Sequence, residues 1–200
     1  MTEWTDTYRR AVEVADGVPD SDKHAVYGAE DGVELPASYR FAEFDSVAAL
    51  CDAITTSEYW LERGGDMAHI EPVACVRQRS NAQSSRGGLY AAGWTIRMLS
   101  SHWNVMDVCH ELAHIMSFWR HLLPTGHSRD FRTEYLSLLR YVAPDLAGPL
   151  ARRFREADLL FDVDSVGWLA LPFDYLIGER LNGALVLPEA VTPVGYTDGR

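Results

Sequence analysis

Residues 108–116 read V-C-H-E-L-A-H-I-M, and the interpretation of the rest of the chain starts from them. Apolar residues occur on nearly every side over 104–120, which predicts a helix buried in a core. Positions four apart on a helix share one face, so the rings of His110 and His114 can bind one metal ion. Glu111 points away from direct ligation and can hold a water on the metal and accept its proton. The stretch therefore predicts a helix that carries a catalytic metal.

A catalytic zinc ion needs a third protein ligand, and three downstream residues are candidates. His121 lies seven residues past His114 and does not fit the metalloproteases whose third histidine comes six residues past the second. His127 follows a loop with proline and glycine that can turn the chain back, whereas Glu134 has the spacing of thermolysin-like enzymes. We favour His127 as the ligand. Glu134 remains the alternative third ligand. If His127 is the ligand, Glu134 either orients a ligand through a hydrogen bond or faces solvent.

The same stretch has a competing interpretation, in which the two histidines and the glutamate form a hydrogen-bonded polar cluster inside a core. A buried helix rarely carries two imidazoles and a carboxylate unless they are paired. The alternating stretch before the helix and the further histidine after it add weight to the metal site.

Hydropathy patterns on either side of the motif helix predict an α+β domain. The predicted helices cover 23–31, 45–61, 128–143 and 145–160, with a break at Gly64 and Gly65. The predicted strands cover 70–79 and 89–99, and the polar turn between them suggests an antiparallel pair. By its position before the motif helix, 89–99 is also the expected edge strand for an extended substrate.

The expected organisation is an N-terminal arm at 1–22, a catalytic domain at 23–164 and an extension at 165–200 that packs on the domain. A length of 200 residues suits one such domain. The formal net charge of -11 disfavours binding to nucleic acid or to a membrane surface. Three cysteines without a C-x-x-C pair suggest neither a disulfide framework nor a zinc ribbon, and the reducing cytoplasm is the expected location.

The motif helix together with T-G-H-S-R-D-F-R-T-E-Y at 125–135 resembles the SprT-like zincin pattern. More closely, residues 23–160 resemble a family of metallohydrolases from actinobacteria and their phages, whose domain opens with a helix like K-H-A-V-Y-G-A-E-D at 23–31. The resemblance implies a zincin-like fold, in which a small antiparallel or mixed sheet packs on the motif helix and the helices after it. It also implies that His110, His114 and His127 bind zinc and that Glu111 is the catalytic base. Ser128 departs from the glycine that SprT-like members often have.

These patterns predict a zinc-dependent hydrolase, above all a metallopeptidase that acts on a peptide or protein substrate. One alternative is a metal-dependent hydrolase of a different substrate. Another is a non-catalytic interaction domain stabilised by zinc. Structural zinc takes four ligands and needs no base, whereas catalysis needs three ligands and a carboxylate such as Glu111.

Overall fold

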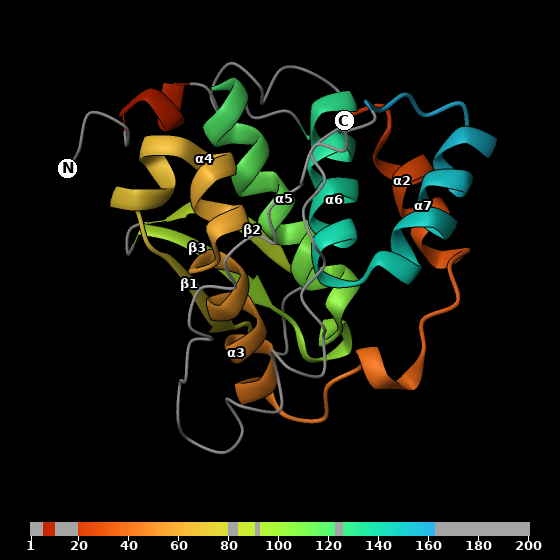
Figure 1. Ribbon diagram of the computed structural model, residues 1–200, viewed down its shortest axis with the longest axis horizontal. Coiled ribbons are helices and arrows are strands. Elements are labelled where there is room, and N and C mark those ends of the chain that lie inside the picture. The colour runs from red at the N-terminus through yellow and green to blue at the C-terminus, as the bar shows by residue number, and fades with distance from the viewer. Residues whose placement is uncertain (1–5, 11–19, 80–83, 91–92, 123–125, 163–200) are drawn as a thin grey trace, which may run out of the picture.

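The helix that carries the two motif histidines, α5 (Val105–His121), runs through the centre of the computed structural model (Figure 1). A small sheet packs on one side of α5, and α6 (Arg129–Val142) packs on the other. Nearly every side chain of α5 is buried, as its apolar sequence predicts. Asn104 caps the helix by accepting a hydrogen bond from the Asp107 backbone N–H at 3.0 Å. The structure describes residues 6–10, 20–79, 84–90, 93–122 and 126–162.

The other helices surround the α5–α6 pair, and the prediction of an α+β fold is confirmed. The helix predicted over 23–31 is present, and the one predicted from 145 begins one residue earlier, with a proline in its first turn. These two helices pack against each other at one side of the molecule (Figure 1). The remaining elements are α2 (Lys23–Asp31), α3 (Phe44–Thr55), α4 (Glu58–Ile70), α7 (Pro144–Glu156) and short 3-10 turns at Ala37–Tyr39 and Ser100–His102.

The single helix predicted over 45–61 is wrong, because the chain forms two helices there. Helix α3 ends at Thr55, and the Ser57 side chain accepts a hydrogen bond from the Trp60 backbone N–H at 3.2 Å. This N-cap starts α4 as a separate helix. Helix α4 then continues past the predicted break, with a kink at Gly65, whose φ of 56° is accessible to glycine.

The sheet has three strands in the order β1-β3-β2, which differs from the predicted antiparallel pair. Strand β1 (Val73–Arg77) runs parallel to β3 (Gly93–Met98), with Cys75 opposite Ile96. Strand β2 (Arg86–Tyr90) is antiparallel to β3; its first three residues were predicted as part of a turn and its last two as the start of the strand at 89–99. The chain thus passes from β1 to β2 at the far edge of the sheet and then reverses into β3, which lies between them and runs parallel to β1.

The expected edge strand at 89–99 is also wrong in its extent and its position. Residues 93–98 form the central strand and are paired on both sides. Within the described part of the chain, β2 has a strand neighbour on one side only, and it packs directly on α5. The edge of the sheet nearest the motif helix is therefore β2.

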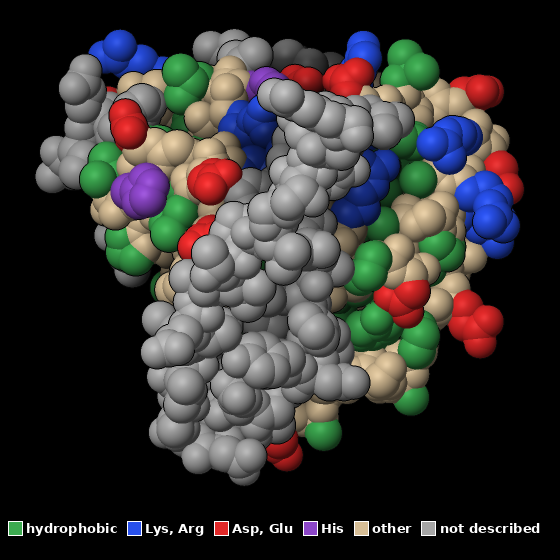
Figure 2. All heavy atoms as spheres, in the orientation of Figure 1, with side chains coloured by type: hydrophobic (Ala, Val, Ile, Leu, Met, Phe, Trp, Pro, Cys, Tyr) green, Lys and Arg blue, Asp and Glu red, His purple; other side chains and the backbone are tan. Residues whose placement is uncertain are grey.

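The predicted N-terminal arm and C-terminal extension are described only in part. The extension at 165–200 lies outside the described residues, while residues 6–10 of the arm are helical. Among the described helices, none combines the length and the apolar character needed to cross a membrane. On the face drawn in Figure 2, the described acidic and basic side chains are dispersed among one another, without a patch of one sign.

Candidate metal centre

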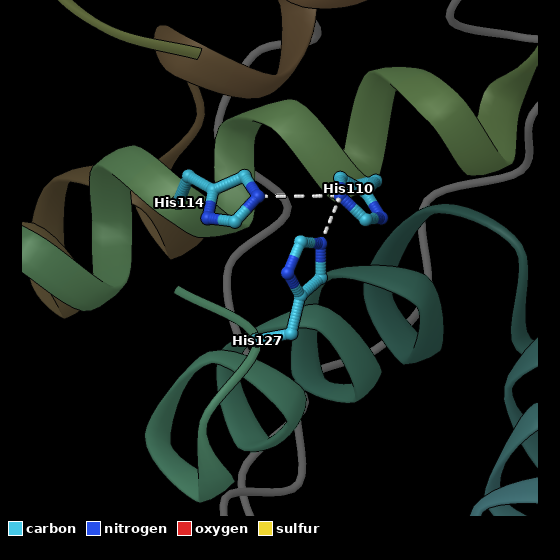
Figure 3. A group of neighbouring side chains, drawn as sticks. All are labelled: His110, His114 and His127. Carbon is cyan, nitrogen blue, oxygen red and sulfur yellow. Dashed lines mark hydrogen bonds between the residues drawn. The ribbon is translucent and has the colours of Figure 1, made fainter. Parts of the chain in front are cut away.

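Three histidine rings meet at one point, where α5 approaches the start of α6 (Figure 3). His110 and His114 extend from α5, and His127 comes from the loop that leads into α6. The Nε2 atom of His110 lies 3.2 Å from Nε2 of His114 and 3.2 Å from Nε2 of His127. The potential ligand atoms all lie within 4.8 Å of one another. The structure thus brings together the three histidines that the sequence singled out.

The spacing of these nitrogens suits a tetrahedral metal ion. Zinc binds imidazole nitrogen at about 2.0–2.1 Å, so two ligands of a tetrahedral zinc lie roughly 3.3–3.4 Å apart. The observed nitrogen–nitrogen distances of 3.2 Å are close to that value. The group could hold a metal ion with at least one coordination position left for another molecule.

Two carboxylates fix the orientation of two of the rings. Glu30 Oε1 lies 2.6 Å from Nδ1 of His110, and Asp20 Oδ2 lies 2.6 Å from Nδ1 of His127. A carboxylate can only accept, so each Nδ1 donates its hydrogen, and each Nε2 is left to supply a lone pair. Lone pairs that face each other at this distance repel unless a metal ion or a proton lies among them. This is the arrangement that metal-binding histidines have.

The protonation of the rings follows from their surroundings. Burial lowers the pKa of His114 well below its ordinary value, and the neighbouring His110 and His127 lower it further. Burial also lowers the pKa of His127. Burial acts in the same direction on His110, but the carboxylates of Glu30 and Glu111 outweigh it and raise the pKa of that ring to about 9. In the absence of a metal ion, His110 therefore carries the proton that separates the three nitrogens.

Glu111 lies beside the ligands in the same cavity, and its side chain is buried. Burial raises the pKa of the Glu111 carboxyl group to about 7, although His110 and a hydrogen bond from the Gly87 backbone N–H lower it. A carboxyl group with this pKa can both accept and release a proton near neutral pH.

Glu134, the alternative third ligand, is held elsewhere by cations. Its carboxylate forms an ion pair with the buried Arg63 of α4, and its second oxygen lies 3.3 Å from Arg120 Nη1. His121, the rejected candidate, lies near the same carboxylate, with 3.9 Å between Nε2 and Oε1. Glu134 thus joins α4, α5 and α6 and does not belong to the histidine group.

The cavity at the three histidines has a volume of about 280 Å³. Tyr27 of α2 lies at its border, with its ring stacked on His110 at 5.7 Å and edge-on to His127 at 5.0 Å between centroids. Lys23 lies one turn earlier on α2, and its Nζ is 5.8 Å from the centre of the Tyr27 ring. With Glu30, these residues form one face of α2 that is directed to the site. The β2 residues Arg86–Gly88 border the cavity as well.

The sequence reasoning missed the residues that hold the third ligand in place. Asp20 belongs to the predicted N-terminal arm, yet it accepts hydrogen bonds from both the ring and the backbone N–H of His127. The buried Arg132 donates to the His127 carbonyl at 2.6 Å and to Asp22 at 2.7 Å. Glu30 lies in the opening helix of the resemblance, which does not imply a chemical role for it.

Comparison of the chain with models of known protein families gave no match, and comparisons with curated proteins and with solved structures gave none either.

Proposed function

We propose that the protein is a zinc-dependent hydrolase, and specifically a metallopeptidase. The observation that supports this most is the convergence of three imidazole nitrogens beside a buried carboxylate at an open cavity. Three imidazoles suit zinc, whereas calcium and magnesium prefer oxygen ligands. Structural zinc sites are closed by four protein ligands, but in the described ranges only three candidate side chains come together here.

The chain's own residues have distinct roles in this proposal. A bound zinc ion would lower the pKa of a water molecule to about 7 and polarise the substrate carbonyl. Glu111 accepts the proton of the attacking water and then delivers it to the leaving amine. Glu30 and Asp20 keep the rings of His110 and His127 in the tautomer that offers Nε2.

The substrate is proposed to bind along β2, since β3 is paired on both sides. An extended peptide can add to a free strand edge through backbone hydrogen bonds. Strand β2 borders the cavity through Arg86, Gly87 and Gly88, so a peptide on this strand would pass beside Glu111.

The first test measures bound metal in the purified protein. We expect one zinc ion per chain in the wild type, and roughly 100-fold weaker binding in the His127→Ala variant, because it loses one of three ligands. The matched control is Glu134→Gln, which alters the other candidate and should keep the metal. Loss of metal in the control with retention in His127→Ala would assign the third ligand to Glu134.

The second test separates an enzyme from a zinc-stabilised interaction domain. Glu111→Gln should bind zinc as the wild type does but hydrolyse a broad peptide library roughly 10²–10⁴-fold more slowly, because it lacks the base. Equal hydrolysis by both proteins, or no hydrolysis by a zinc-loaded wild type, would contradict the proposed activity.

A further inference from the structure

Two cationic side chains border the cavity at the three histidines. Lys23 is the single lysine of the chain and begins α2, whereas Arg86 begins β2. These elements lie on opposite sides of the α5–α6 pair in Figure 1, so the two cations come to one cavity from different parts of the fold.

Neither cation is neutralised within the part of the chain that the structure describes. No carboxylate there lies within ion-pair distance of Lys23 or of Arg86, whereas Arg63, Arg129 and Arg132 each pair with an acidic residue. Both side chains are exposed where they border the cavity, so their charges are accessible to a ligand.

These two cations offset the acidic groups at the site. The carboxylates of Glu30, Asp20 and Glu111 lie around the histidines, and the charge of Asp107 also acts on His110 and Glu111. Without a counter-charge, these groups would repel an anionic substrate. Lys23 and Arg86 each add one positive charge at the same cavity, although the whole chain has a net charge of -11.

We propose that the site selects peptides that carry a carboxylate close to the bond to be cleaved, and that Lys23 and Arg86 contact this carboxylate. The inference rests on the proposed function and names its substrate class. A guanidinium can bind a carboxylate through two parallel hydrogen bonds, and an ammonium group adds a point charge. The carboxylate can belong to an Asp or Glu side chain or to a peptide C-terminus, because both present the same group.

The experiment compares the hydrolysis of quenched fluorescent peptide mixtures that are identical except for one chemical group, either an internal side chain or the C-terminal group. In the first arm, peptides amidated at the C-terminus carry Glu, Gln or Lys at one fixed internal position. In the second arm, the same peptides end in a free carboxylate or an amide. We expect kcat/KM to be roughly ten-fold higher for the carboxylate in at least one arm, with the difference shrinking as salt is added. The arm that shows the preference identifies the source of the carboxylate.

Variants assign the preference to the two side chains. Lys23→Gln and Arg86→Gln should each reduce the Glu-to-Gln ratio by roughly three-fold or more, and Lys23→Glu should favour the Lys-containing mixture. The matched control is Arg152→Gln, an exposed arginine of α7 that does not border this cavity. Bound zinc and circular dichroism are recorded for each variant, so that a fold defect is recognised. Ratios within about two-fold of one in both arms, or equal ratios in wild type and Lys23 variants, would overturn the inference.

Binding to the zinc-loaded Glu111→Gln protein, measured by fluorescence anisotropy with the same peptides, separates this inference from the proposed activity. Stronger binding of the carboxylate peptides without hydrolysis by the wild type would refute the peptidase and retain the carboxylate site. Hydrolysis without any preference in rate or binding would refute the carboxylate site and retain the peptidase. If the wild type does not hydrolyse peptides and the carboxylate peptides do not bind more strongly, both proposals are refuted.

Discussion

The His110 ring contacts a carboxylate through Nδ1 and faces two other imidazoles through Nε2. The proton on this ring occupies the position that a metal ion requires. Because Glu30 and Glu111 outweigh burial and raise the pKa of His110 to about 9, the metal-free protein holds this proton at neutral pH. Metal binding must therefore displace it.

We predict that zinc binding at pH 8 releases close to two protons per ion, about one from His110 and about one from the zinc-bound water, whose pKa would be about 7. Zinc affinity should therefore rise with pH up to pH ~9. The sign follows from the raised pKa of His110: below 9 the proton competes with the metal, and above 9 it is already lost. At pH 8 the Glu111 carboxyl group, with a pKa of about 7, is mostly ionised and contributes little. Calorimetry in buffers of different ionisation enthalpy measures the proton count.

Glu30→Gln is the matched variant for this prediction, because its amide oxygen can still accept from Nδ1 but carries no charge. Proton release at pH 8 should then fall by up to one proton, towards the single proton of the zinc-bound water, since the carboxylate that most raises the pKa of His110 is gone. An unchanged proton count in this variant would show that another group is titrating.

The sequence could predict the three ligands. Two of them are spaced by one helical turn, and the third follows a loop with proline and glycine that can turn the chain back towards the motif helix. It could not predict the carboxylates behind them. Glu30 is 80 residues from His110, and Asp20 is 107 residues from His127. No local periodicity links residues so far apart, because only the packing of α2 and the 20–22 segment against the site brings them together.

At the scale of secondary-structure elements, the decisive contact is between β2 and α5. A Cβ atom at Gly87 would lie 2.2 Å from the backbone oxygen of Glu111. Both groups belong to the backbone of regular elements, so neither can move aside cheaply. The strand can approach the helix this closely only because residue 87 has no side chain.

We predict that Gly87→Ala destabilises the protein by about 1–3 kcal/mol, because β2 must move away from α5. The same movement lengthens the hydrogen bond from the Gly87 N–H to the Glu111 carboxylate, so hydrolysis should also decrease. Urea unfolding and peptide hydrolysis measure the two effects.

Gly28→Ala in α2 provides the comparison, since nothing outside its own helix and chain neighbours lies within 4 Å of the added Cβ atom and the residue is exposed. Alanine is favoured in helices by up to about 1 kcal/mol over glycine, so this variant should be as stable as the wild type or more so. If both alanine variants unfold at the same urea concentration, the close approach of β2 to α5 does not matter for stability.

The elements also show where the sequence pattern was insufficient. Helices α5 and α6 were predictable because their apolar residues repeat over several turns and Asn104 and Ser128 supply caps. Strand β2 was not, because R-G-G-L-Y has two glycines and no β-branched residue. It is a strand because it pairs with β3 and lies against α5, which are tertiary contacts.

At the scale of the whole molecule, the histidine group joins parts of the chain that are distant in sequence. His110 and His114 belong to the central helix, and His127 to the entry of α6. Through Glu30 and Asp20 the group also reaches α2 and the 20–22 segment. A bound ion would therefore stabilise the folded arrangement of all these parts against unfolding.

We predict that removing the metal with a chelator lowers the melting temperature. At free zinc about 1,000-fold above its Kd, a site absent from the unfolded chain adds about 4 kcal/mol of stability. For a chain of this size, that corresponds to roughly 8–16 °C. Differential scanning fluorimetry with and without zinc measures the shift.

The His127→Ala variant should show little of this zinc-dependent shift, because it lacks a complete site. An equal shift in the variant would mean that zinc stabilises the chain elsewhere, through residues outside the histidine group. A wild type that melts at one temperature under both conditions would argue against any ion at this position.

The separation between Asp20 and His127 has a consequence for biosynthesis. A ribosome makes residue 20 before residue 127, which follows more than a hundred residues later, with the two motif histidines in between. A nascent chain that has reached residue 121 can offer two rings but not the third. Capture of the ion by all three rings must therefore wait until His127 has been made, and a molecule that retains its ion is one in which the 20–30 segment and the motif helix have already folded together.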